Sequence, residues 1–240
     1  MNLISIKSPN FSKKTRNINK IRFLIIHYTG MQSMRASIKR LTSIKHKVSC
    51  HYLIGRNGKI FQMVEDNKIA WHAGKSKWGK LKNLNSNSIG IELVNKGHKF
   101  GYQKFSRKQI SALVKLCFKL KIKYKIKNRF ILGHSDIAPL RKSDPGEKFP
   151  WLELKKRKIG IWHSLSKKSS LFKKLSGKDI RKIFFKNLYK VGYRYFNKKK
   201  HSKTDKLIIK SFQRRFRQEK VDGKIDLECL KISFNLAKNH

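Results

Sequence analysis

Residues 21–27 read IRFLIIH, and this stretch decides the class of fold. It is a short, continuous apolar run, which is typical of a strand buried on both faces of a sheet. A second run, SIGIELV, covers residues 88–94, and residues 130–133 form a further short one. Buried strands need helices on their faces, so we expect an α/β fold (α+β in a stricter vocabulary) with a mixed central sheet flanked by helices.

The segments between these strands carry signals for a hairpin and two helices. Residues 49–64 place Asn57-Gly58 between two β-rich runs, which is a strong hairpin signal. Apolar residues at helical spacing predict helices over residues 34–44 and 106–124.

The charge of the chain is extreme, with 60 Lys+Arg against 13 Asp+Glu and a formal net charge of +47. Such a balance can indicate a polyanion partner such as nucleic acid. However, the lysines are scattered along the whole chain, and no helix-turn-helix, zinc-finger or RNA-binding motif is found. We therefore expect no specific nucleic-acid partner, with a basic nucleic-acid-binding protein as the less favoured alternative.

No apolar run approaches the ~18 residues of a membrane span, so no transmembrane segment is expected. Residues 1–20 are interpreted as a basic, loose leader without the apolar core of a signal peptide. This predicts a cytoplasmic protein, with the periplasm or cell envelope as the alternative. The three cysteines (Cys50, Cys117 and Cys229) are far apart and are expected to be buried free thiols. We expect a monomer.

The character of the chain changes beyond about residue 162. Residues 163–177 are rich in Lys and Ser and are predicted to be a linker. Residues 178–240 are predicted to form a small three-helix domain, with helices over 178–191, 203–217 and 227–238 and an N-cap at Asp226.

Chemistry-bearing residues gather at the ends of the predicted strands. His27 ends the first strand, Glu92 lies within another, and His134 follows a third, while Lys142 and Asp144 lie in the proline-bounded loop after it. Two imidazoles, one carboxylate and an open position are the donor set of a catalytic zinc site. A further carboxylate could shuttle protons, and a lysine could stabilise an oxyanion. Spacing alone does not establish this, because a single histidine is more often a structural group than a ligand.

Five blocks of sequence, in this order, carry a family resemblance: FLIIHYTG, SCHYLIGRNGKIFQMV, AWHAG, NSIGIELVN and GHSDIAPLRKSDPGEKFPW. Together they resemble the zinc-dependent N-acetylmuramoyl-L-alanine amidases of type 2, which share their fold with the peptidoglycan recognition proteins. The resemblance covers residues 21–162, which we expect to be the catalytic domain.

The resemblance implies a role for each residue of the constellation. His27, His134 and Asp144 match the ligands of one zinc ion. Glu92 matches the carboxylate that orients or deprotonates the attacking water, and Lys142 matches the residue that polarises the scissile carbonyl. The implied reaction hydrolyses the amide between the lactyl group of N-acetylmuramic acid and L-alanine in peptidoglycan or muropeptides.

Further positions match the substrate groove of such enzymes, namely Tyr28, His51, Trp71, His72 and Arg141. For three of them an alternative stays open: core packing for Trp71, a structural role for His51 and a solvated loop charge for Arg141. Asp136 is expected to cap its loop or to orient a ligand, not to bind the metal.

The C-terminal segment resembles the three-helix peptidoglycan-binding domain that accompanies many cell-wall hydrolases, through FQRRF and the turn VDGKID. Its alternative is a helical appendage in which Phe212, Phe216 and Leu230 are core residues only. A rival function of another class is a non-catalytic peptidoglycan-recognition protein. The complete set of matching ligands, Glu92 and Lys142 disfavours that rival.

Overall fold

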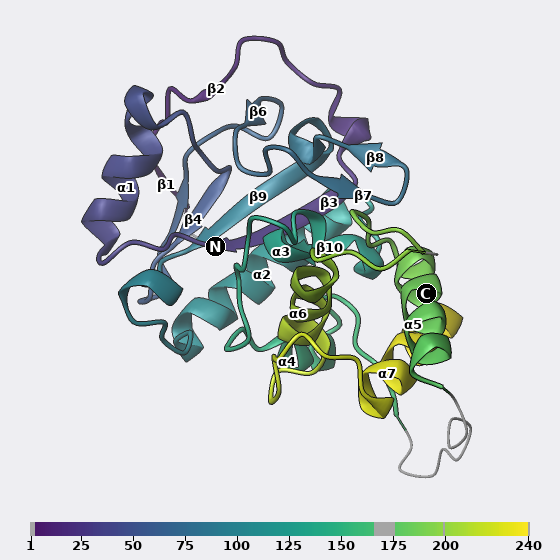
Figure 1. The fold of residues 1–240 in the computed structure, drawn as a ribbon. Coiled ribbons are helices and arrows are strands. Elements are labelled where there is room, and N and C mark those ends of the chain that lie inside the picture. Colours follow the sequence, from purple (N-terminus) through teal and green to yellow (C-terminus); the bar gives the residue numbers. More distant parts are fainter. Residues whose placement is uncertain (1–2, 166–175, 199, 240) are drawn as a thin grey trace.

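The computed structural model describes residues 3–165, 176–198 and 200–239 (Figure 1). Its centre is a six-stranded sheet in the order β1-β5-β4-β9-β3-β10. These strands span Leu3–Ser5, Ile60–Gln62, Tyr52–Ile54, Ser88–Leu93, Phe23–Tyr28 and Ile131–Gly133, respectively. All neighbours pair in parallel except β4 and β5, so the sheet is mixed and the predicted fold class is confirmed.

The central strands β3 and β9 are buried on both faces, as their apolar runs predict. Along β3 the side chains alternate between two cores: Phe23 and Ile25 belong to one cluster, and Leu24 and Ile26 to the other. Each face of the sheet therefore needs its own cover of helices.

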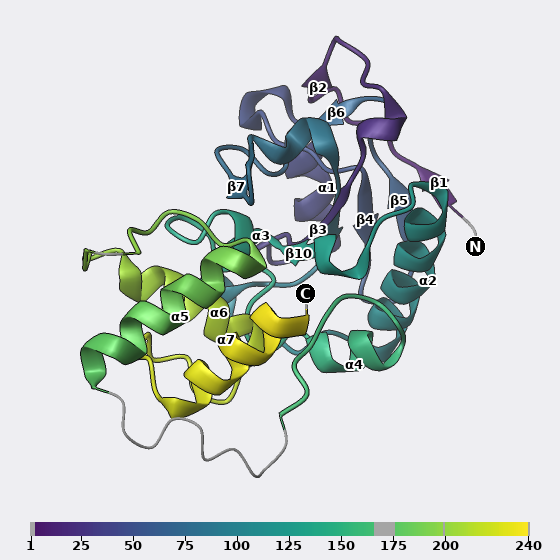
Figure 2. The same ribbon diagram turned by 90° about the vertical axis from the view of Figure 1, so that its right-hand side faces the viewer.

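Helices cover both faces (Figures 1 and 2). On one face, α2 (Arg107–Lys123) and α4 (Trp151–Lys156) pack against the cluster that contains Leu24 and Ile26. The helix α1 (Met34–Thr42) packs near β4 through a smaller cluster. The predicted hairpin is also confirmed, because β4 and β5 pair antiparallel across Asn57-Gly58.

The other face is covered by α5 (Gly177–Val191), α6 (Asp205–Phe216) and α7 (Leu227–Asn239). These are the three predicted C-terminal helices, shifted by one or two residues at their ends. The Asp226 carboxylate accepts from the Cys229 amide at 2.9 Å, which confirms the predicted N-cap. Most of the predicted linker, residues 166–175, lies outside the described residues.

The leader departs from its prediction, because it is not loose. β1 pairs with β5 at the edge of the sheet, and β2 (Phe11–Ser12) pairs with β6 (Ile69–Ala70). Arg16 is buried, and its guanidinium donates to the carbonyls of Asp66 at 2.9 Å and Ser88 at 2.6 Å. A basic side chain thus satisfies backbone carbonyls that would otherwise be buried without a donor.

The remaining elements are short. A two-stranded ribbon joins β7 (Lys77–Trp78) to β8 (Leu81–Lys82), and α3 covers His134–Ile137. Turns of 3-10 helix lie at Ile18–Lys20, Ile44–His46, Leu84–Asn87, His98–Phe100 and Asn128–Phe130. None of the helices in the described ranges has the length and apolar run needed to cross a bilayer. All three cysteines are free and buried, as predicted.

Candidate active site

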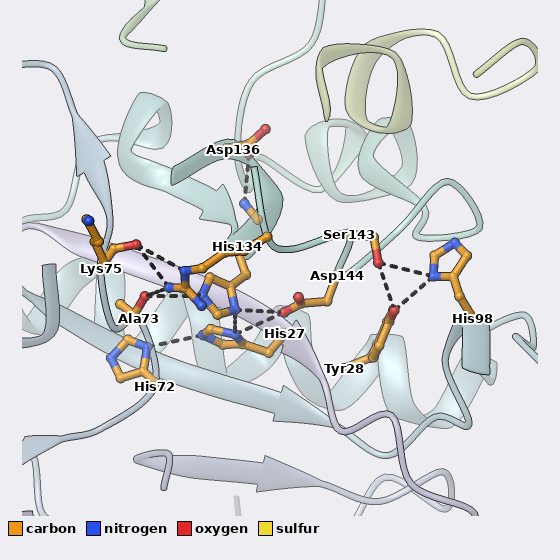
Figure 3. A network of polar contacts seen from close by, with 12 residues as sticks. His27, Tyr28, His72, Ala73, Lys75, His98, His134, Asp136, Ser143 and Asp144 are labelled. Carbon is orange, nitrogen blue, oxygen red and sulfur yellow. Dashed lines mark hydrogen bonds and ion pairs between the residues drawn. The ribbon is translucent and has the colours of Figure 1, made fainter. Parts of the chain in front are cut away.

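Three predicted ligands meet at the carboxyl end of the central strands (Figure 3). His27 lies near the end of β3, and His134 directly follows the adjacent strand β10. Asp144 comes from the loop beyond α3, where its backbone carbonyl accepts from the Ser135 amide at 2.9 Å. The two Nδ1 atoms are 2.9 Å apart, and each lies 3.1 Å from Asp144 Oδ2.

The tautomer of His134 follows from its other nitrogen. Nε2 lies 3.2 Å from the carbonyl of Ala73, which can only accept, and 3.4 Å from Arg141 Nη2, which donates to the carbonyls of Ala73 and Lys75 instead. The proton is therefore on Nε2, and the lone pair of Nδ1 points toward Asp144.

The tautomer of His27 is fixed by a longer chain of hydrogen bonds. The Ser88 hydroxyl donates to the Leu84 carbonyl at 2.6 Å, so it accepts from His72 Nε2 at 3.2 Å. His72 Nδ1 is then an acceptor, and it lies 3.1 Å from His27 Nε2. His27 consequently carries its proton on Nε2 and, like His134, turns an unprotonated Nδ1 to the centre of the site.

Three acceptor atoms thus converge, and their placement fits a bound metal ion. Burial and the neighbouring His134 lower the pKa of His27 to about 4, so it is neutral at physiological pH. A set of two imidazole nitrogens and one carboxylate oxygen suits a zinc ion.

Glu92 lies beside this set, because it pairs in register with His27 across β3 and β9. Its Oε2 is buried and has no hydrogen-bond partner among the described residues. Burial and the charge of Asp144 raise the pKa of Glu92 to about 8, whereas Lys142 opposes the shift. A buried carboxyl with a pKa near neutrality is suited to accept and return a proton.

The site opens into a cleft of about 470 Å³. Nine of the ten predicted site residues line it: His27, Tyr28, Trp71, His72, Glu92, His134, Arg141, Lys142 and Asp144. His51 is the exception. It is fully buried, its Nδ1 accepts from the Gly90 amide at 3.0 Å, and its Nε2 lies 3.2 Å from the Lys68 carbonyl. This corrects the expected substrate contact: His51 holds neighbouring backbone together below the cleft.

Two of the expected groove residues also hold the predicted metal ligands in place. His72 holds His27, as described above. Arg141 donates to the carbonyls of Ala73 and Lys75, and so fixes the segment whose carbonyl orients His134. Substrate contact remains a prediction for both.

The other two groove residues, Tyr28 and Trp71, have partners of their own. The Tyr28 hydroxyl contacts His98 Nδ1 at 2.8 Å and Ser143 Oγ at 3.1 Å. Trp71 is partly buried and donates from Nε1 to Ser12 Oγ at 3.3 Å. Both line the cleft, and their contact with substrate also remains a prediction.

Several supporting residues were not found from the sequence. Ser88 and Gly90 lie in the quoted strand, but only the structure shows that the His72 ring packs on Gly90 and bonds Ser88. His98, which had no expected role, contacts Tyr28. Asp136 caps its loop as predicted, with Oδ2 accepting from the Gly133 amide at 2.8 Å.

A donor set that fits a metal ion, a buried carboxyl with one oxygen unpaired among the described residues, and an open cleft are together typical of a hydrolase site. Residues 17–147, more than half of the chain, match the Amidase_2 family, described as N-acetylmuramoyl-L-alanine amidase. The chain belongs to this family and is an enzyme of the N-acetylmuramoyl-L-alanine amidase class.

Individual relatives span both parts of the chain. N-acetylmuramoyl-L-alanine amidase AmiD of Escherichia coli is 34% identical over 237 residues, covering 92% of this chain and 84% of that protein. Its structure with anhydro-N-acetylmuramic acid-L-Ala-D-gamma-Glu-L-Lys has a TM-score of 0.81 at 29% identity, covering 95% of this chain and 92% of the other. AmpDh3 of Pseudomonas aeruginosa, with anhydromuramic pentapeptide, gives a TM-score of 0.82 at 31% identity and covers 97% of both chains.

A third relative matches a smaller share of the chain. The 1,6-anhydro-N-acetylmuramyl-L-alanine amidase AmpD of Haemophilus influenzae is 34% identical over 164 residues, covering 61% of this chain and 86% of that protein.

Proposed function

We propose that this chain uses one zinc ion to hydrolyse the amide between the lactyl group of N-acetylmuramic acid and L-alanine, in peptidoglycan or in muropeptides, during cell-wall turnover or recycling. One observation carries the proposal: two unprotonated imidazole Nδ1 atoms and a carboxylate oxygen converge within 3.1 Å, beside a buried glutamate without a partner. A stable structural cluster would place protons between such atoms.

His27 Nδ1, His134 Nδ1 and Asp144 Oδ2 would hold the ion. When bound, zinc supplies Lewis-acid activation of water and of the scissile carbonyl.

The residues of the chain then perform the proton transfers. Glu92 accepts a proton from the water whose oxygen attacks the carbonyl carbon. It returns this proton to the amide nitrogen as the C–N bond breaks, leaving the lactyl carboxylic acid and the L-alanine amine. The second water proton then passes from the acid to the amine, which gives carboxylate and ammonium at neutral pH. The Lys142 ammonium lines the same cleft and offsets the negative charge that develops on the carbonyl oxygen.

The charge of the cleft supports an anionic substrate. Arg40, Lys99 and Arg141 line it in addition to Lys142. Muropeptides carry carboxylates on their stem peptides, and the AmiD and AmpDh3 structures hold anhydromuramyl peptides. We therefore propose muropeptides with free stem-peptide carboxylates as substrates.

Mass spectrometry of purified muropeptides incubated with the protein tests the proposal. We expect free stem peptide and the matching peptide-free sugar, lost on chelation and restored by zinc. Glu92→Gln is the matched control and should bind zinc but release peptide far more slowly than the wild type. Intact muropeptides retained by zinc-loaded wild-type protein would instead identify a recognition protein.

Peptidoglycan binding by the C-terminal helices is a second part of the proposal, supported by the resemblance of that segment. The motif residues Phe212, Gln213, Arg215 and Phe216 are all buried, so binding would use other side chains. Cosedimentation of the chelated, inactive full chain with insoluble peptidoglycan tests it. Protein that stays in the supernatant would contradict binding.

A further inference from the structure

We propose that the C-terminal helices are part of the metal site, because Arg215 of α6 positions the ligand His134 through Asp136. The inference rests on the proposed metal site. It gives the C-terminal unit, which comprises α5, α6 and α7 with the segments that join them, a role in catalysis that is separate from any binding of peptidoglycan.

The carboxylate of Asp136, a residue of helix α3, has partners at both of its oxygens. All four residues of α3 are buried, and the helix begins with His134. Asp136 Oδ2 accepts from the Gly133 amide and forms an ion pair with Arg215, in which both side chains are almost completely buried. Asp136 Oδ1 accepts from the Tyr193 hydroxyl at 2.6 Å. Two of these three partners belong to the C-terminal unit.

Helix α6 contacts the backbone on both sides of His134 in the sequence. Arg215 Nη2 donates to the Ile131 carbonyl at 3.0 Å, on the strand that precedes His134. The Ser211 hydroxyl donates to the carbonyl of Ser135, the residue that follows it, at 2.7 Å. The backbone of His134 is therefore fixed from both sides by one helix of the C-terminal unit.

The apolar packing agrees with the polar contacts. One core cluster contains Ile25 and Leu132 of the sheet together with Phe184 and Phe212 of the C-terminal helices. The C-terminal unit also contacts the β7–β8 ribbon, where the Gly79 amide donates to the Gly192 carbonyl at 2.9 Å. The C-terminal unit thus completes the core beneath α3 and is not a module attached only by its linker (Figure 2).

Removing the guanidinium would leave the Asp136 carboxylate buried without its counter-charge. The carboxylate would then draw water into the site, and α3 would shift. Changes in groups that orient ligands typically weaken metal binding by roughly 10–100-fold, because ligand placement must be accurate.

The test compares two substitutions on the full chain. Arg215→Met removes the proposed positioning group. Arg217→Met is the matched control: its guanidinium is equally buried and lies at the same helix end, but it pairs with Asp226 within the C-terminal unit. Zinc affinity is measured by competition with a chromophoric chelator. Amide hydrogen exchange of residues 131–138 is measured on the metal-free proteins, which gives a second readout without metal or turnover.

We expect zinc binding about 10–100-fold weaker in Arg215→Met, with faster exchange over residues 131–138, and neither change in Arg217→Met. Equal zinc affinity in Arg215→Met and wild type, or an equal loss in Arg217→Met, would overturn the inference.

If Arg215→Met does not fold, the same two measurements are made on Tyr193→Phe, which removes only the hydroxyl that donates to Asp136. A weaker effect in the same direction supports the inference, and unchanged affinity and exchange overturn it. Wild-type protein that binds no zinc would contradict the proposed function instead. The exchange of residues 131–138 would then still decide whether α6 holds α3.

Discussion

Replacing Gly90 by alanine should damage the metal site without touching a ligand. A Cβ built at Gly90 lies 2.4 Å from Cγ, 2.6 Å from Nδ1 and 2.7 Å from Cδ2 of His72. Ordinary contact begins at 3.4 Å, so the imidazole has to retreat by about 1 Å. Glycine is therefore required here for the close approach of a ring.

The retreat of His72 breaks its hydrogen bond to His27. That bond is 3.1 Å long, and a further ~1 Å exceeds hydrogen-bond range. The Nε2–H of His27 would stay buried without an acceptor, which costs about 1–3 kcal/mol. Because the same bond sets the tautomer and orientation of the ligand, zinc affinity should fall by roughly 10–100-fold.

Chelator competition gives the zinc affinity, and urea unfolding of the metal-free protein gives the free energy of unfolding. Gly177→Ala is the control, because a Cβ there meets no atom within 4 Å and the residue begins a helix. It should leave zinc affinity unchanged. Wild-type zinc affinity in Gly90→Ala would refute the proposed role of the His72–His27 bond.

Three further results are expected. Glu92→Gln should lower kcat by about 10²–10⁴-fold while zinc affinity changes little, because Glu92 handles the proton and is not a ligand; a comparable loss of zinc would contradict this. Burial lowers the pKa of His51 to about 3, so the unfolded chain takes up a proton below pH 6.5 that the native chain refuses. The metal-free protein should therefore lose stability as pH falls from 6.5 toward 3, with up to about 2 kcal/mol from His51 between pH 6.5 and 5. Urea unfolding at pH 6.5 and pH 5 measures this loss. The free energy of unfolding of His51→Asn should fall less between the two pH values than that of the wild type, and an equal fall would contradict the low pKa of His51. Burial also raises the pKa of Cys117 to about 12 and of Cys229 to about 11, and raises that of Cys50 well above its usual value. Iodoacetamide at pH 8 should therefore label none of the three in native protein and all three after unfolding, as judged by mass; rapid native labelling would contradict their burial.

The central strands, the hairpin and the helices were predictable because their signals are local. Apolar runs, Asn57-Gly58 and helical spacing depend only on neighbours in sequence, and each element formed within a few residues of its predicted bounds. The ligands could be assigned only through the resemblance, since His27 and Asp144 are separated by 117 positions.

What could not be predicted depends on contacts between distant segments. The leader appeared loose because its partners, β5 and β6, lie far along the chain. His51 occupies a sequence position suited to a groove residue, but its ring accepts a hydrogen bond from a backbone amide of β9 and is buried. The Arg215–Asp136 pair joins residues 79 positions apart, and one more arginine carries no signal in so basic a chain.

The most direct test of the central claim is to titrate zinc into the chelated protein and to measure muropeptide hydrolysis at each zinc concentration. The account predicts that activity rises linearly to one zinc per chain and then stays constant, and that Asp144→Ala removes both tight zinc binding and activity. Full hydrolysis by the chelated protein, or unchanged zinc binding in Asp144→Ala, would contradict it.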